Sequence, residues 1–241
     1  MATKSIEVQA AAQREDRRRS TPEVGGVAWG DLRRLQPISR VFGLDRGTPI
    51  DRYYIERFLE QQAEDIRGGV LEVAEDTYTR RFGGPRVARA DILYPPPGHP
   101  RATLTVDLAR PRSLPADAFD CIILTQTLLC IYEVRATLAN CRQALRPGGV
   151  LLATFPGISQ ISRYDMDRWG DYWRFTTRSA VRLFGEVFSQ DRVTVTAYGN
   201  VLAATAFLHG LAAEELHRPE LDYRDPDYEL VITVRAVREE A

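Results

Sequence analysis

The chain of 241 residues, 44% of them hydrophobic, is long enough for one sizeable α/β domain. Its formal net charge of −1 gives no global field that would attract nucleic acid or an anionic membrane. Three cysteines without CxxC spacing and three dispersed histidines indicate buried thiols in a reducing compartment and no metal site. Because no apolar run approaches the ~20 residues that span a bilayer, we expect a soluble, cytoplasmic protein.

The N-terminal part of the chain is polar before it becomes helical. Residues 1–28 include the arginine-rich run 14–19, which lacks interleaved aromatic residues, and we expect a flexible tail there. Residues 29–68 are expected to form a helical cap, because apolar residues recur at helical spacing over 50–66. The main domain is then expected over 69–241.

From residue 69 onward, strand and helix patterns alternate. Short apolar runs rich in β-branched residues are typical of strands buried on both faces of a parallel sheet. Such runs lie at Val70–Val73, Val87–Leu93, Leu104–Leu108, Phe119–Thr125 and Val150–Phe155, and later strands are predicted at Val193–Tyr198 and Leu230–Val237. Helices are predicted over Val134–Leu145, Thr177–Phe188 and Val201–Leu216. The order indicates a doubly wound α/β sheet with helices on both faces.

About twenty residues after the strand at 150–155 interrupt this pattern. The segment at about 156–176 is rich in Tyr, Trp, Arg and Asp, which is too polar for a core and too aromatic for a simple linker. We expect it to form a lid over a substrate. Asp171 and Arg174 are its candidate catalytic residues, with Asp171 as a general base, and Trp173 is a candidate stacking surface for substrate.

A second chemically crowded segment precedes the predicted helix at 50–66. Arg46 and Tyr53 belong to it, and they could bind an anionic or sugar substrate through bidentate and stacking contacts. The alternative is that the arginines pair with local acids while Tyr54 packs in the core. The sequence leaves both possibilities open.

Three motifs resemble those of class I S-adenosylmethionine (SAM)-dependent methyltransferases, and the resemblance extends over roughly residues 50–237. They are Val70-Leu71-Glu72-Val73, Phe119-Asp120-Cys121-Ile122-Ile123 and Leu145-Arg146-Pro147-Gly148-Gly149-Val150-Leu151-Leu152. The resemblance implies a Rossmann-like, doubly wound, seven-stranded and mainly parallel sheet with an antiparallel last strand, together with an N-terminal helical segment and a lid insertion. It also implies SAM as the cofactor.

The resemblance implies roles for residues at the carboxyl ends of the strands, where open α/β sheets bind ligands. Asp91 would hold the ribose hydroxyls, Asp107 would face the adenine amino group, and Glu72 would lie near the methionine end of the cofactor. Other expected cofactor-binding residues are Ala74, Glu75, Leu108, Thr125 and Gln126. The alternatives are that Glu72 caps the next helix and that Asp91 points to solvent.

The turn after the first strand departs from the family pattern. Ala74, Asp76 and Tyr78 stand where glycines are expected, and Asp76 adds a carboxylate where the carboxylate of SAM would approach. The sequence predicts O-methylation of a sugar or small secondary metabolite, without metal. One alternative is an enzyme of the same fold that catalyses a cyclisation, elimination or rearrangement in natural-product biosynthesis.

The segment Tyr172–Thr176 resembles one in methyltransferase-like proteins that are encoded beside glycosyltransferases and natural-product pathways. A second alternative is therefore a non-catalytic partner of a glycosyltransferase. A homodimer is also compatible with the sequence, whereas nucleic acid and membrane are not expected partners.

Overall fold

The computed structural model describes residues 21–240 and divides the chain into two units, residues 1–36 and 37–241. The described part of the first unit contains one 3₁₀ turn, η1 (Gly30–Leu32). The tail predicted over 1–28 falls largely outside the described residues. All the helices and strands considered below belong to the second unit. No helix among residues 21–240 is both long and apolar enough to cross a membrane.

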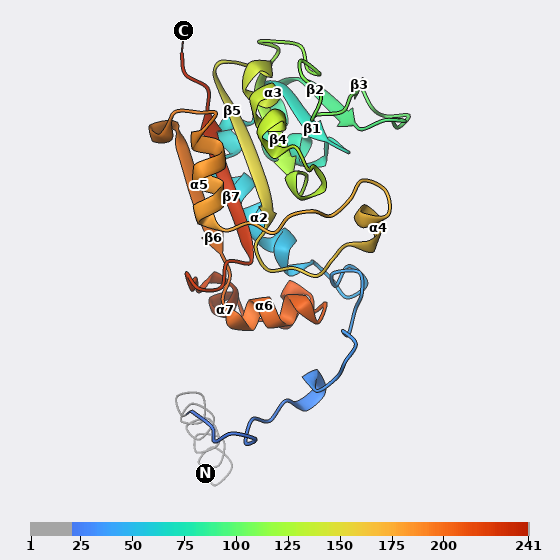
Figure 1. The fold of residues 1–241 in the computed structure, drawn as a ribbon, viewed down its shortest axis with the longest axis vertical. Coiled ribbons are helices and arrows are strands. Elements are labelled where there is room, and N and C mark those ends of the chain that lie inside the picture. The colour runs from blue at the N-terminus through green and yellow to red at the C-terminus, as the bar shows by residue number, and fades with distance from the viewer. Residues whose placement is uncertain (1–20, 241) are drawn as a thin grey trace. The chain divides into compact units, whose positions relative to one another are not determined.

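The second unit is built on a seven-stranded sheet with the strand order β3-β2-β1-β4-β5-β7-β6 (Figure 1). The strands are β1 (Gly68–Val73), β2 (Val87–Tyr94), β3 (Leu104–Thr105), β4 (Phe119–Thr125), β5 (Leu145–Pro156), β6 (Val193–Tyr198) and β7 (Val231–Val237). The first five strands are parallel, whereas β7 runs antiparallel to both β5 and β6. The predicted mainly parallel, Rossmann-like sheet is therefore confirmed.

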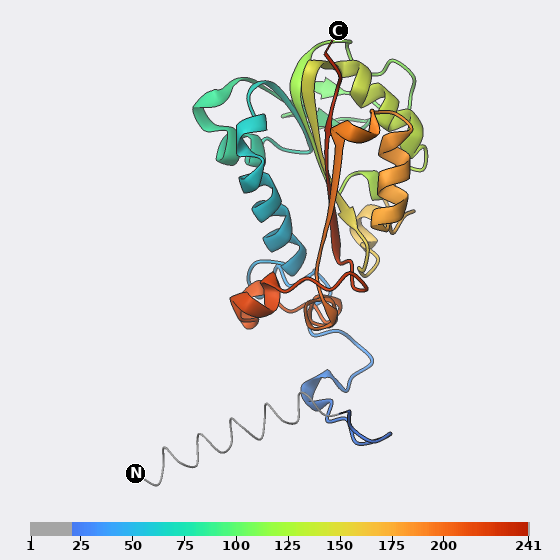
Figure 2. The same cartoon turned by 90° about the vertical axis from the view of Figure 1, so that its left-hand side faces the viewer.

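Helices cover both faces of this sheet (Figure 2). The helix α2 (Ile50–Gln61) covers one face, and α3 (Val134–Ala144) and α5 (Thr177–Gly185) cover the other. The helices α6 (Val201–Leu208) and α7 (Arg218–Asp222) lie beyond the end of the sheet at which β5 ends, and the short α4 (Arg163–Met166) belongs to the lid (Figure 1).

Each face of the sheet carries its own apolar core, because successive side chains of a strand point to opposite faces. In β4, the fully buried Ile122 packs into the core under α3 and α5. Its neighbour Ile123, also fully buried, packs into the core under α2 and α6. The central strands are thus apolar on both faces, as the continuous apolar runs predict.

The β1–β3 side of the sheet is connected by short segments. Between β1 and β2 the chain forms only a π-helical turn, η3 (Thr79–Gly83), and a 3₁₀ turn, η4 (Gly84–Arg86). The described chain between β2 and β3 contains no helix. Turns and loops therefore form the edge of the sheet at which β1 and β2 end, and this is the edge where the fold places its ligands.

Candidate functional site

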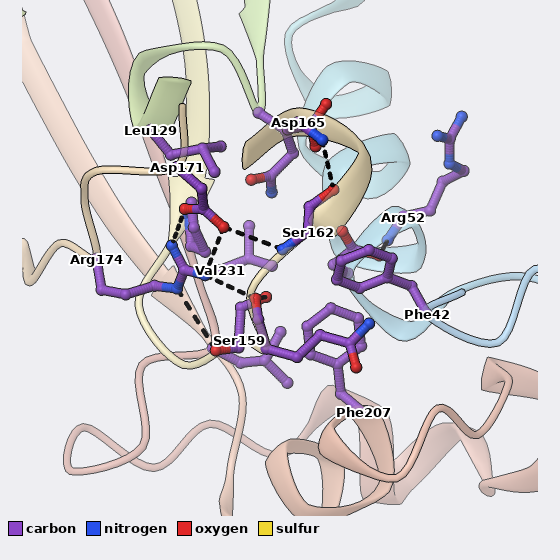
Figure 3. A pocket seen from close by; sticks show the side chains of 15 residues that line it. Phe42, Arg52, Leu129, Ser159, Ser162, Asp165, Asp171, Arg174, Phe207 and Val231 are labelled. Atoms are coloured by element: carbon purple, nitrogen blue, oxygen red, sulfur yellow. Dashed lines mark hydrogen bonds and ion pairs between the residues drawn. The ribbon is translucent and has the colours of Figure 1, made fainter. Parts of the chain in front are cut away.

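A pocket opens at the carboxyl ends of β4 and β5, beneath the lid (Figure 3). It lies beside the point between β1 and β4 at which the strand order reverses. Its polar lining consists of Asp51, Arg52, Gln126, Ser159, Gln160, Ser162, Asp165, Asp171 and Arg174. Its apolar lining consists of Phe42, Leu129, Pro156, Phe207, Leu230 and Val231. The predicted residues Gln126, Asp171 and Arg174 therefore meet in one pocket.

The lid is held together internally by the Asp171 and Arg174 pair. The Asp171 side chain is fully buried, and its Oδ2 accepts hydrogen bonds from Arg174 Nη2 at 3.1 Å and from the backbone N–H of Ser162 at 3.0 Å. Arg174 Nη2 also donates to the carbonyl of Gln160 at 2.6 Å (Figure 3). Both predicted catalytic residues thus have bonding partners within the lid.

The aromatic residues of the lid attach it to the loop after β4. The backbone N–H of Tyr172 donates to the carbonyl of Leu129 at 2.8 Å. Trp173 Nε1 donates to the carbonyl of Ile131 at 3.1 Å, and its ring stacks on Tyr132 with centroids 5.4 Å apart. Trp173 therefore anchors the lid from outside the lining of the pocket.

Two further carboxylates line the pocket. Asp51 lies in the first turn of α2, where burial raises the pKa of its carboxyl to about 6 and the charge of Arg52 opposes that rise. Asp165 lies on α4, and within the described residues its carboxylate has no hydrogen-bond or ion-pair partner. A carboxyl whose pKa is about 6 suits a general base.

Two aromatic rings form an apolar wall opposite the lid. Phe42 and Phe207 pack against each other with centroids 5.8 Å apart at 32°, and both line the pocket (Figure 3). The pocket therefore combines a polar lid side with an aromatic side.

The turn after β1 keeps the backbone bend of a glycine turn without its glycines. Ala74 has φ 72°, in the left-handed region that favours glycine. Glu72 is 3% exposed, and its carboxylate accepts the backbone N–H groups of Tyr78 at 3.2 Å and Thr79 at 2.7 Å. Burial raises the pKa of Glu72, and these hydrogen bonds oppose the rise. Glu72 thus fixes the turn and caps the segment that follows.

The side chains at the other two expected glycine positions are buried. Asp76 Oδ2 accepts from Arg80 Nε at 2.5 Å, and Asp76 Oδ1 accepts from Arg101 Nη2 at 3.0 Å. Tyr78 is 7% exposed and packs into the core under α2. The bend at Ala74 therefore keeps the backbone course of a glycine turn, whereas the clearance that the two missing glycines would give is filled by side chains.

The remaining predicted cofactor residues are spread along this edge. Asp91 lies inside β2, paired in register with Leu71, and its carboxylate accepts from Arg89 Nε at 2.6 Å and from Thr103 Oγ1 at 3.0 Å. The residue that ends β2 is Tyr94, which stacks on His99 with centroids 5.2 Å apart and meets Trp169 of the lid edge-on at 6.0 Å.

The loop after β3 places Asp107 at the surface and Leu108 in the core. Asp107 Oδ1 accepts the backbone N–H of Ala109 at 2.9 Å, and its side chain is 48% exposed. Leu108 is 4% exposed and packs against α3. At the end of β4, Thr125 is the last strand residue, and Gln126 follows it with φ 47°.

Other predicted residues lie away from the pocket. Glu75 is exposed and accepts the Thr77 hydroxyl at 2.8 Å. Arg46 pairs with Glu215, its Nε donating to Oε2 at 2.9 Å. The Tyr53 hydroxyl donates to Asp222 Oδ1 at 2.7 Å, which raises the pKa of that hydroxyl together with burial.

Arg46 and Tyr53 therefore bond to acids that are remote in sequence, which agrees with pairing of the arginine rather than with a place in the pocket. Most of the pocket residues were not predicted as site residues, among them Phe42, Asp51, Asp165 and Phe207. Asp51 and Asp165 each occur in a segment that is rich in charged and aromatic residues. Whether their side chains point into the pocket depends on how α2 and the lid pack against the sheet, which the sequence does not show.

Comparison with known proteins agrees with this architecture. Residues 85–153 match the family model described as a methyltransferase domain. The crystal structure of the CurJ carbon methyltransferase is 16% identical with a TM-score of 0.51, and the match covers 83% of this chain and 58% of that chain. A SAM-dependent methyltransferase from Archaeoglobus fulgidus is 9% identical with a TM-score of 0.51, covering 78% of this chain and 94% of that chain.

The sequence has no significant match among curated proteins. At these identities the structural likeness concerns the fold, and this chain spans 58% of the length of the CurJ methyltransferase chain. The matched segment and the seven-stranded sheet together confirm the resemblance to class I SAM-dependent methyltransferases.

Proposed function

We propose that this protein is a SAM-dependent methyltransferase that methylates a hydroxyl group of a small polar molecule, such as a sugar or a secondary metabolite. The observation that carries the proposal is the pocket at the ends of β4 and β5, beside the reversal of strand order, with Asp51 on its wall. A carboxyl with a pKa of about 6 is ionised at neutral pH and can accept the proton of a hydroxyl nucleophile.

In this proposal, one group of residues holds the cofactor and another group acts on the acceptor. The bend at Ala74, the Glu72 carboxylate beneath it and Gln126 after β4 are the residues we propose for holding the cofactor, which supplies an already activated methyl group. Asp51 removes the proton of the acceptor, while Asp171 and Arg174 keep the lid in shape so that water is excluded and the acceptor is aligned.

Calorimetric titration with SAM and with S-adenosylhomocysteine tests the cofactor, and transfer of a labelled methyl group to a panel of sugars and polyols tests the reaction. We expect micromolar binding of both cofactors. Asp51→Asn should lower the rate of transfer ~10²- to 10⁴-fold with cofactor binding retained, because a general base contributes that much. Asp167→Asn, an exposed acid at the end of α4, is the matched control.

One observation favours a second candidate function, another reaction on the same fold. Arg80 and Arg101 hold Asp76 in the turn where the methionine end of SAM would approach. Absence of binding by both SAM and S-adenosylhomocysteine would overturn methyl transfer and favour a cyclisation, elimination or rearrangement in the same pocket. If Asp76→Gly then creates SAM binding, the ion pairs of Asp76 are what excludes the cofactor.

A further inference from the structure

The charged groups on the wall of the pocket leave a negative balance. Asp171 and Arg174 neutralise each other through an ion pair that consists of two hydrogen bonds within the lid. Of the other charged lining residues, Asp51 and Asp165 are acidic and Arg52 is basic. The Arg52 side chain extends away from the other labelled side chains, and its guanidinium lies 6.0 Å from the Tyr78 ring centroid (Figure 3).

The carboxylates of Asp51 and Asp165 can still accept hydrogen bonds from a ligand. Within the described residues, the one hydrogen bond to the Asp51 carboxylate comes from the backbone N–H of Arg52 at 2.8 Å. The Asp165 carboxylate has none there. Burial raises the pKa of the Asp51 carboxyl although the charge of the adjacent Arg52 opposes that rise, and no ion pair to this carboxylate is formed within residues 21–240.

The aromatic side of the pocket points to the same kind of ligand independently of the acids. Phe42 and Phe207 present rings to the cavity, and the face of an aromatic ring attracts a cation through its quadrupole. An anionic group would meet two carboxylates and two aromatic side chains, with only Arg52 to offset them. The geometry therefore disfavours phosphorylated or carboxylated acceptors.

We propose that the acceptor carries a protonated amine, which Asp51 and Asp165 neutralise and which the rings of Phe42 and Phe207 face. This inference rests on the proposed acceptor role of the pocket and narrows it to a cationic, amine-bearing small molecule. The same pocket then discriminates against the neutral and the anionic analogue of one substrate by charge alone.

Three probes that share one hexose ring test the charge preference by ligand-observed NMR, without any cofactor: glucosamine, glucose and glucose 6-phosphate. We expect glucosamine to bind at least ~5-fold more tightly than glucose, and glucose 6-phosphate to bind most weakly, with the preference reduced at high salt. Equal affinities for the three probes, or no binding of glucosamine, would overturn the inference.

Variants separate the two elements of recognition. Asp165→Asn should reduce the preference for glucosamine over glucose at least ~3-fold, whereas Asp167→Asn should leave it unchanged. Phe42→Leu keeps an apolar side chain and removes the ring, so that glucosamine binding should fall while glucose binding changes less. An unchanged preference in Asp165→Asn and Phe42→Leu, with folding verified by circular dichroism, would contradict the assignment.

These outcomes are distinguishable from those of the proposed function. If SAM does not bind but glucosamine is still preferred, the proposal of methyl transfer is contradicted and the proposal of an amine-bearing ligand stands. If SAM binds but the protein has equal affinity for the three sugars, the proposal of an amine-bearing ligand is contradicted and the proposal of methyl transfer stands.

Discussion

Single residues carry most of the departures from the family pattern, and Ala74 is the clearest of them. Its left-handed backbone, with φ 72°, is one that a glycine adopts without steric penalty, and alanine is disfavoured there by ~1–2 kcal/mol. The residue at position 74 thus differs from the glycine expected by the motif, but the backbone adopts the bend that this glycine would allow.

Ala74→Gly should raise the free energy of unfolding by ~0.5–1 kcal/mol, since relief of strain exceeds the added freedom of the unfolded chain. Urea denaturation measures the change. Ala139→Gly, on the exposed side of α3, is the opposite control and should lower the same quantity by ~1 kcal/mol. A destabilised Ala74→Gly variant would show that the methyl group contributes packing that outweighs the strain.

The carboxyl of Asp51 makes stability depend on pH. Its pKa is raised from 3.8 to about 6 by burial, so that between these values the folded state binds more protons than the unfolded state. Stability contributed by this group is therefore lost as pH rises from about 4 to about 6. Asp51→Asn should flatten the fall in urea midpoint over that range, and Asp167→Asn should not. If the urea midpoint of Asp51→Asn fell with pH as steeply as that of the unchanged protein, a group other than Asp51 would cause the pH dependence.

At the scale of elements, composition marks the lid segment as irregular but does not predict its internal bonding. The excess of Tyr, Trp, Arg and Asp over 156–176 identifies an irregular segment above the sheet. Whether Asp171 faces a substrate or Arg174 depends on backbone turns that composition does not encode. The same holds for Arg46 and Tyr53, whose partners Glu215 and Asp222 are remote in sequence.

Removal of the Asp171 charge should loosen the lid first. Because the Asp171 side chain is fully buried and bound to Arg174, Asp171→Asn leaves the guanidinium without its counter-charge, and breaking such pairs commonly costs ~3–5 kcal/mol. Hydrogen exchange should accelerate over residues 159–175 while β4 and β5 stay protected. The exposed pair of Arg182 and Glu186 gives a control, since Arg182→Ala should change exchange little. Uniform acceleration throughout the sheet would contradict a local role.

Boundaries of the regular elements follow the sequence closely where capping residues are explicit. The strand at 193–198 has its predicted bounds, and α5 begins at the capping box formed by Thr176 and Ser179. The helix predicted over 201–216 instead ends at Leu208, because Gly210 adopts φ 71° and reverses the chain. The strand predicted over 104–108 shortens to β3, since only two residues find a partner in β2.

At the scale of the whole molecule, one sheet joins two apolar cores, and the apolar runs alone predict both. Ile122 and Ile123 are adjacent in β4 and fully buried on opposite faces. The sequence does not predict in the same way that, in the described chain, no α-helix directly follows β1 or β2. A short polar connection forms a helix only where it can pack against the rest of the protein.

Ile122→Ala and Ile123→Ala should each lower the free energy of unfolding by ~2–5 kcal/mol, since both substitutions leave a cavity in a fully packed core. In both variants, far-ultraviolet circular dichroism and tryptophan fluorescence should report one coincident urea transition, because the shared strands couple the two faces. Separate transitions for the two probes would mean that the cores unfold independently.

The internal bonding of the lid also has a kinetic consequence. Asp171, Arg174, Ser162 and Gln160 all belong to the lid, so their bonds travel with it when it swings. Opening breaks mainly the contacts of Tyr172 with Leu129 and of Trp173 with Ile131, which are neutral hydrogen bonds and ring packing. We therefore expect the rate at which the lid opens to vary little with ionic strength.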